Sequence, residues 1–325
     1  MSPRLVVATL VMCVALIFAS SFMHLTNTGL GSPDSYGLIA PGAVSEAGEA
    51  TTAKHAILPS GIADRVHRGV ANVLQILIVA VAFVAFRKRK EPDALPLFVP
   101  MAALGVSLIL AFLGAWFGSP LRYPWIMMTN LIGGFTLLAL FWWLALDVFA
   151  SSGADSKRGD RVRTPAIMSL LVLIVAIVLG AWTDVYYAAL ACSTLPDCQG
   201  QWLPGLKLWE GLSMLGTLDI DAHGRVIIDQ AVAADIHMAH RIGALAASAM
   251  IFWLAIRSWN AGSGFRPLGV LLLLLLLIQT VSGIVTVAAG LSVAVVVGHN
   301  LLSALLVINI LTLIHRSAGK HRALS

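Results

Sequence analysis

The apolar residues of this chain gather in long uninterrupted runs instead of the short alternating pattern of a soluble fold. A helix that crosses the hydrocarbon core of a bilayer needs about 20 mostly apolar residues. Runs of nearly this length or more lie at 4–23, 66–86, 97–117, 124–147, 165–183, 232–257, 267–289 and 294–315. The seventh run contains seven successive leucines at 271–277, whereas the sixth also contains Asp235, His237, His240 and Arg241. The pattern predicts an all-α integral membrane protein with eight transmembrane helices.

Composition supports a membrane protein over a soluble one. The 325 residues are 58% hydrophobic and 11% charged, whereas soluble domains contain about 25% charged residues. A net charge of +5 would also suit a nucleic-acid-binding protein, but the basic residues lie in short clusters between apolar runs, as at 87–90 and 157–163. Such clusters are typical of cytoplasmic loops. We therefore expect membrane lipid around the chain and no nucleic acid partner.

The same basic residues predict the topology. Of the 21 Lys and Arg residues, 14 fall in the N-terminus, the 87–96, 148–164 and 257–266 loops and the C-terminal tail. The positive-inside rule then places both termini in the cytoplasm and the two long loops on the outer side, as in a bacterial inner membrane. The first run could be a signal peptide, but it exceeds the usual apolar core of roughly 7–15 residues. We expect a retained first helix.

The two halves of the chain share one layout. Residues 1–150 and 151–325 each contain a long outer loop, a basic inner loop and a short outer loop between four apolar runs. His67 near the start of the second run has a counterpart in His240 of the sixth, and an arginine follows each. Internal repeats are a common way to build membrane folds. The layout predicts two repeated four-helix bundles, related by an axis along the membrane normal.

Two histidines within the predicted spans are the strongest candidates for chemistry. An ionisable side chain at the bilayer centre costs roughly 2.5–3.5 kcal/mol, so its presence suggests a function. His240 and His299 fall at similar depth on the sixth and eighth runs, with Gly243 and Gly298 leaving space nearby. Imidazole is a common ligand of haem iron, so the pair suits a haem held between two helices. The alternative is that each ring only hydrogen-bonds a neighbouring helix; His237, one turn before His240, is a candidate supporting group.

The first half lacks a counterpart to the second of these histidines. His67 corresponds to His240, but the fourth run holds Thr129 or Asn130 where another histidine is expected. A neutral amide or hydroxyl is a poor ligand for haem iron. A site in the first half would therefore have one open or water-filled axial position, which is also what a reactive metal requires.

The remaining candidate groups lie outside the predicted histidine sites. Cys192 and Cys198 are separated by five residues in an outer loop, where a disulfide is favoured. Closing so short a loop adds on the order of 2–3 kcal/mol. Cys13 within the first run is expected to be an inert core thiol. His315 and His321, in the basic tail, are expected to be solvated.

Longer motifs resemble one known family. In the second half these are GAWT at 180–183, YAALAC at 187–192, PDCQGQWLP at 196–204, IHMAHRIGA at 236–244 and GHN at 298–300. The first half matches more loosely through HLTNTGLG at 24–31, VHR at 66–68, LGAW at 113–116 and NLIGG at 130–134. Together they resemble the haem A synthase family.

The resemblance implies a fold, a reaction and a set of site residues. Members of the family have eight helices in two bundles and oxidise the C8 methyl group of haem O to a formyl, which gives haem A for terminal oxidases. The resemblance implies that His240 and His299 bind a haem b that passes electrons. It implies that haem O binds in the first half, with His67 as axial ligand. Asp64, where the family has a glutamate, would be an acid/base or cation-stabilising group.

Other features leave alternatives open. Arg68 and Arg241 are predicted, from charge and position alone, to pair with haem propionates. The first half departs from the family pattern at Asp64, at Asn130, at Ser32 and Leu38 in place of a cysteine pair, and at His24 in place of an arginine. His24 or His55 could replace the missing ligand. The alternative function is a non-catalytic haem b-binding protein in oxidase assembly, haem handling or electron transfer, followed by a transporter. A haem O synthase and the terminal oxidase assembly machinery are the expected partners.

Overall fold

Eight helices long and apolar enough to cross a membrane make up most of the chain in the computed structural model. The structure describes residues 2–27, 60–92, 94–116, 124–149, 156–186, 188–203, 205–212, 219–220, 226–227, 229–288 and 292–318. The long helices are α1 (Pro3–Asn27), α2 (Ser60–Lys88), α3 (Phe98–Trp116), α4 (Pro124–Phe149), α5 (Ser156–Val185), α6 (Gln230–Asn260), α7 (Arg266–Ala288) and α8 (Val293–Ser317). The prediction of an all-α integral membrane protein with eight spans is confirmed.

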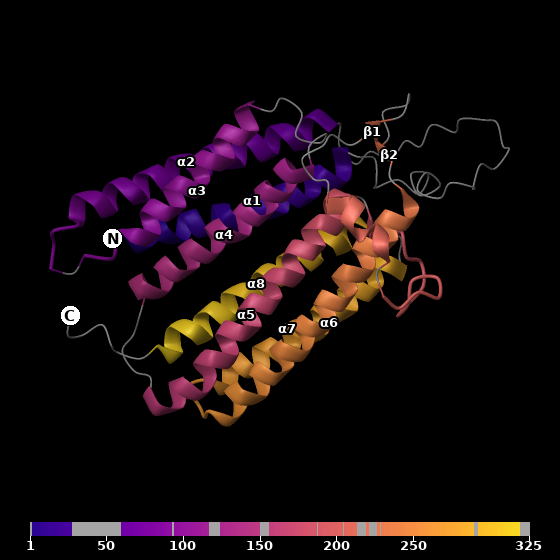
Figure 1. The fold of residues 1–325 in the computed structure, drawn as a ribbon. Helices are drawn as coiled ribbons and strands as arrows, with labels where there is room; N and C mark the ends of the chain where they lie inside the picture. The colour runs from indigo at the N-terminus through magenta and orange to yellow at the C-terminus, as the bar shows by residue number, and fades with distance from the viewer. Residues whose placement is uncertain are drawn as a thin grey trace.

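Short elements lie between α5 and α6. They are the 3-10 helices η3 (Ala188–Leu190) and η4 (Leu206–Leu212), and an antiparallel pair of two-residue strands, β1 (Asp219–Ile220) and β2 (Val226–Ile227). Asp219 is opposite Ile227 in that pair. These elements extend from the end of the helical bundle (Figure 1).

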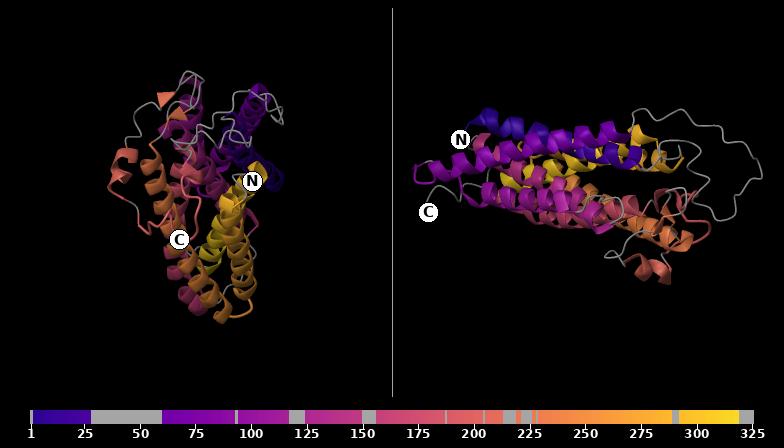
Figure 2. Two further views of the ribbon diagram at one scale, coloured as in Figure 1. Left: turned by 90° about the vertical axis from the view of Figure 1, so that its right-hand side faces the viewer. Right: turned by 90° about the horizontal axis from the view of Figure 1, so that it is seen from above.

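The helices pack in two groups of four that lie side by side (Figures 1 and 2). In the first group α1 and α3 each contact both α2 and α4, and in the second α5 and α7 each contact both α6 and α8. Each group therefore forms a ring of four helices. In the first ring α2 lies opposite α4, and in the second α6 lies opposite α8. The groups meet where α8 packs against α1 and α4, and α5 against α4. The internal symmetry and the boundary between residues 150 and 151 stay predictions.

One buried apolar core runs through both groups. Phe141 and Leu144 on α4 are almost completely buried, as are Leu306 and Ile310 on α8, and all four belong to the same cluster. A polar contact also links the groups near this cluster, because the indole Nε1 of Trp142 donates a hydrogen bond of 2.9 Å to a hydroxyl of α8. The two groups of helices thus pack as a single unit.

Helix α5 begins nine residues earlier than hydropathy predicts. The prediction starts the span at Pro165, but the helix runs from Ser156 and contains that proline in its interior. The extension packs against the end of α8: a Cβ atom at Gly159 would lie 2.6 Å from the carbonyl oxygen of Ser317. Tertiary packing therefore extends the helix into a basic segment that hydropathy alone assigns to a loop.

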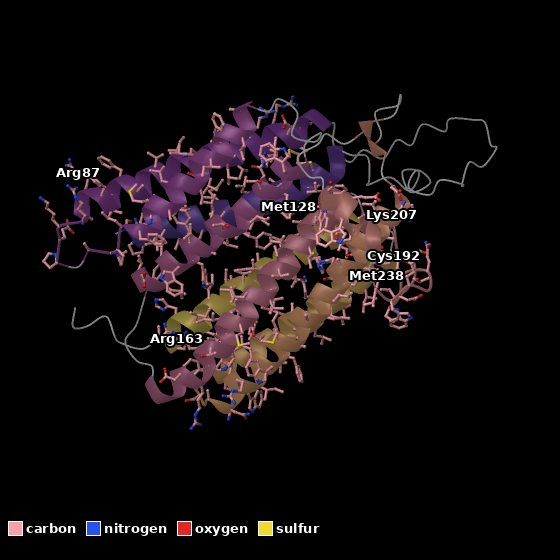
Figure 3. All side chains as sticks on the ribbon, in the orientation of Figure 1. Arg87, Met128, Arg163, Cys192, Lys207 and Met238 are labelled. Carbon is pink, nitrogen blue, oxygen red and sulfur yellow. A yellow bond between two sulfur atoms is a disulfide. The ribbon has the colours of Figure 1, made fainter. Side chains whose placement is uncertain are left out.

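Two arginines of the predicted inner loops lie toward the same end of the bundle. Helix α1 begins and α8 ends at the same end of the molecule (Figure 1). Arg87 and Arg163 lie toward that end, whereas Cys192 and Lys207 lie at the opposite one (Figure 3). The shared location of these basic residues agrees with the predicted topology. Which end faces the cytoplasm stays a prediction.

His315 is not solvated, so that prediction was wrong. Its Nε2 atom lies 2.9 Å from Oδ1 of Asp147, and its side chain is 21% exposed. The imidazole also makes an edge-on contact with the ring of Trp143. A buried carboxylate needs a polar or charged partner, and the packing of α8 on α4 brings this histidine to Asp147.

Several predictions concern residues that the structure does not describe. The positions concerned are Ser32, Leu38, His55 and His321, together with the side chain of His24. The proposals that His24 or His55 replaces a missing ligand therefore stay untested.

Candidate functional site

Glycines of α5 and α6 shape the surroundings of His240 on α6. A Cβ atom at Gly180 would lie 3.0 Å from Cε1 of the imidazole, so the absence of a side chain makes room for the ring. At Gly243, one turn later on α6, a Cβ atom would come within 2.7 Å of Leu179. Glycine at both positions therefore allows α5 and α6 to approach closely beside the histidine.

The imidazole of His240 contains an unsatisfied buried atom. Its Nδ1 is buried and has no hydrogen-bond partner among the described residues, although the backbone of Ala176 faces the ring. A buried polar atom left without a partner costs about 1–3 kcal/mol. Placing this imidazole in a membrane-spanning helix therefore costs free energy, which is expected of a residue with a function.

His299 on α8 is surrounded by polar groups of α7. Its Nδ1 lies 2.9 Å from the hydroxyl of Ser282, and its Nε2 lies 3.0 Å from the amide nitrogen of Gln279. A Cβ atom at Gly283 would be 3.2 Å from Cε1 of the ring. A Cβ atom at Gly298 would meet nothing within 4 Å, so there is open space on α8 immediately before the histidine.

The two histidines come from opposite corners of one helical ring. His240 is ten residues after the start of α6, and His299 is six residues after the start of α8. Both histidines therefore lie in the half of the helical bundle where α6 and α8 begin. Two imidazoles on opposite helices, with small residues beside them, fit a haem with two axial histidines, because the porphyrin itself supplies the other four ligands.

Bare metal ions require a different arrangement. Over the ranges that the structure describes, no group of three or more His, Cys, Asp or Glu side chains lies together as a metal site would need.

Arg241, next to His240, binds a loop. Its guanidinium donates hydrogen bonds to the carbonyl oxygens of Thr194 (2.8 Å), Asp197 (2.7 Å) and Cys192 (3.0 Å). Its Nε also lies 3.3 Å from Nε2 of His237. Sequence analysis missed this contact with the loop because no local pattern links α6 to a segment more than 40 residues earlier. The predicted pairing of Arg241 with a propionate stays a prediction.

The loop that Arg241 holds contains the predicted disulfide. Cys192 and Cys198 are bonded with an S–S distance of 2.02 Å, which confirms the prediction. Both are buried, and they pack with Met238 of α6. His237 is also buried, and its Nδ1 has no hydrogen-bond partner within the described part of the chain. The disulfide loop thus covers α6 directly beside the candidate haem ligand.

A second anchor joins the following segment to α6. The carboxylate of Asp235 is buried and accepts a hydrogen bond of 2.6 Å from the backbone N–H of Gly205. A Cβ atom at Gly205 would lie 2.9 Å from the same carboxylate, so a larger residue would disturb this contact. The predicted span around α6 tolerates Asp235 because its charge has a backbone partner at the helix start.

In the first half, the candidate residues occupy two opposite helices. Asp64, His67 and Arg68 lie on one turn of α2, and Asn130 lies on α4 across the ring. The carboxylate of Asp64 forms an ion pair of 2.8 Å with Nε of Arg68, and both side chains are partly exposed. The structure therefore joins two groups to which sequence analysis gave separate roles.

Gln75 is a further candidate that sequence analysis missed. It lies two turns after His67 on α2, and its Nε2 is buried without a hydrogen-bond partner among the described residues. Residues eight apart on a helix lie near the same face. The sequence signal that could have identified it is a single glutamine within the otherwise apolar stretch 73–86.

Fold and site together define a helical membrane protein with paired imidazoles suited to a haem. Comparison with known proteins agrees with this class. Residues 3–311 match the COX15-CtaA family, described as cytochrome oxidase assembly protein, and the chain belongs to this family. A protein named heme A synthase from Shewanella oneidensis is 32% identical over 327 aligned positions, covering 97% of each chain. A heme A synthase from Rhizorhabdus wittichii is 28% identical over 182 positions, which cover 55% of this chain and 48% of that relative.

Proposed function

We propose that this protein is a haem A synthase, a membrane oxidoreductase that converts haem O to haem A by oxidising the C8 methyl group to a formyl. The observation that carries the proposal is the pair His240 and His299, two imidazoles from opposite corners of one ring of helices. Membership of a cytochrome oxidase assembly family and similarity to two heme A synthases support the same reaction.

The second half is the electron-transfer half in this proposal. His240 and His299 would hold a haem b, which when bound accepts and releases single electrons. The surroundings keep both rings in place: Gly180 leaves room for the first, and Ser282 contacts the second. Converting a methyl group to a formyl removes electrons from the substrate, so a carrier of electrons close to the substrate site is required.

The first half is the substrate half. His67 would be the axial ligand of haem O, and Asp64, one turn before it, would act as an acid/base or cation-stabilising group. Arg68 uses Nε to bind Asp64, which leaves guanidinium N–H groups for a propionate. Gln75 would place a buried amide donor on the same side of α2.

The alternative is a non-catalytic haem b-binding protein. One observation favours it: Asn130 is on α4 at the position where the family pattern has a second histidine. In that case the second half would still bind haem b, and the first half would not oxidise haem O. The protein would then act in oxidase assembly, haem handling or electron transfer.

One experiment separates the two functions. The chain is expressed together with a haem O synthase in a host that makes no haem A, and the extracted haems are identified by mass. Haem A in the extract is expected, and an Asp64→Asn variant should produce less of it. Haem B bound stoichiometrically to the purified protein, with no haem A, would favour the alternative.

The cellular setting follows from the same proposal. The protein would lie in the bacterial inner membrane with both termini in the cytoplasm and the disulfide loop outside. It would receive haem O from a haem O synthase and serve the assembly of a terminal oxidase. Labelling of single cysteines introduced at Arg87 and Lys207 with a membrane-impermeant reagent tests the topology, because only the cysteine at position 207 should react in intact cells.

A further inference from the structure

Three residues on one face of α7 enclose the imidazole of His299. Gln279, Ser282 and Gly283 are spaced three and four residues apart, so their side chains lie on the same side of the helix. The hydroxyl of Ser282 is 2.9 Å from Nδ1, and the amide nitrogen of Gln279 is 3.0 Å from Nε2. Both ring nitrogens therefore have a partner from the same helix.

The hydrogen bonds of Ser282 determine which nitrogen carries the proton when a metal is bound. A ligating Nε2 has no proton, so Nδ1 carries it and must donate. The Ser282 hydroxyl donates its own hydrogen to the carbonyl oxygen of Gln279 at 2.9 Å, which leaves its lone pairs to accept from Nδ1. This leaves Nε2 without a proton, so its lone pair can accept a hydrogen bond or bind a metal.

Gln279 occupies the other side of the ring. Its amide nitrogen lies 3.0 Å from Nε2 of His299 and 2.8 Å from the hydroxyl of Ser303, while its Oε1 is buried without a partner among the described residues. The amide thus satisfies Nε2 when no iron is bound. Because iron would need the same lone pair, the Gln279 side chain has to move when haem binds.

We propose that Ser282 is a positioning residue for the haem ligand His299, and that Gln279 holds the same imidazole before haem arrives. The inference rests on the proposed bis-histidine haem site. Metal-binding histidines commonly donate their second N–H to a neighbouring acceptor, which fixes the ring and raises the basicity of the ligating nitrogen. A more basic ligand stabilises ferric iron, so Ser282 lowers the reduction potential of this haem.

The two axial ligands are therefore unequal. His299 has a side-chain acceptor at Nδ1, whereas Nδ1 of His240 is buried without a hydrogen bond to any described residue. Because Ser282 is not itself a ligand, its replacement should change the reduction potential of the haem and leave both axial histidines in place.

The test uses the full chain, purified with haem b from a host that lacks a haem O synthase. Variants Ser282→Ala and Ser282→Thr are compared with Thr280→Val, a control that removes another hydroxyl of α7 whose hydrogen bond is made to Leu276. The midpoint potential is measured by optical titration. Ser282→Ala should raise it by up to about 59 mV, a tenfold change in a one-electron equilibrium. Ser282→Thr should have the wild-type potential, because it keeps the hydroxyl. The control Thr280→Val should also have the wild-type potential.

The results separate this inference from the proposed function. A haem-containing Ser282→Ala protein with the wild-type potential would overturn the role of Ser282. A wild-type protein without haem, or one whose spectrum is unchanged in His299→Ala, would instead contradict the haem site itself. Haem content and size-exclusion profile show whether each variant is folded.

Gln279 has its own readout. Because its amide competes with iron for Nε2, Gln279→Leu should bind haem more tightly, by roughly fivefold if one ordinary hydrogen bond is released. Haem transfer to excess apomyoglobin measures the change. Faster loss of haem from a folded Gln279→Leu protein would show that the amide supports the bound state and would overturn its proposed role.

Discussion

Replacement of Arg241 should release the disulfide loop. Three of its hydrogen bonds to loop carbonyls are 2.7–3.0 Å long. Bonds to charged groups contribute about 1.5–3 kcal/mol, but this guanidinium is partly exposed, so about 1 kcal/mol for each bond is a better value. Arg241→Met should therefore lower the free energy of opening the loop by about 3 kcal/mol, which makes the open state about a hundredfold more populated.

The rate of disulfide reduction measures this opening. Cys192 and Cys198 are buried, so dithiothreitol reaches them when the loop opens locally. Alkylation of the freed thiols should show reduction about a hundredfold faster in Arg241→Met and about tenfold faster in Arg241→Lys, which keeps the charge but not the planar fork. Arg257→Gln removes a charge from the far end of α6 and should have no effect. A reduction rate within twofold of wild type in Arg241→Met would refute the conclusion that Arg241 holds the disulfide loop in place.

Three further predictions concern other contacts. Gly180→Val should lower haem content by tenfold or more, because its Cβ atom alone would lie 3.0 Å from Cε1 of His240, and pyridine haemochrome measures the content. Asp147→Asn should lower the melting temperature in detergent, because the buried partner of His315 loses its charge; an unchanged value would contradict this. The hydrogen bond from Lys207 lowers the pKa of Asp229. The ionised carboxylate therefore stabilises the fold fully above its unfolded pKa of about 3.9, and this stabilisation is lost as the pH falls below that value. Asp229→Asn should therefore melt at a lower temperature than wild type at pH 7, and this difference should shrink at pH 3.

The transmembrane helices could be predicted from sequence because each depends on a local property, a run of apolar residues. The largest difference is at the start of α5, where contact between Gly159 and the end of α8 extends the helix past the apolar run. Contacts between distant segments leave no such pattern. The pairing of His315 with Asp147 joins residues 168 positions apart, and hydropathy assigned that histidine to a solvated tail.

The candidate site also combines residues that a local sequence property identifies with residues that only the fold brings together. His240 and His299 could be identified because an ionisable residue within an apolar run is conspicuous. The groups that surround them could not, since Gln279 and Ser282 are ordinary polar residues in α7 until the fold places them against His299. Arg241 was identified as a charge, but its partners depend on how the disulfide loop folds back over α6.

The central claim is that His240 and His299 bind one iron between them. Electron paramagnetic resonance of the purified ferric protein tests it most directly. We predict a low-spin signal with two imidazole ligands in the wild type, converted to high-spin or lost in both His240→Ala and His299→Ala, and retained in His67→Ala when only haem b is supplied. A low-spin signal that persists in either of the first two variants would contradict the account.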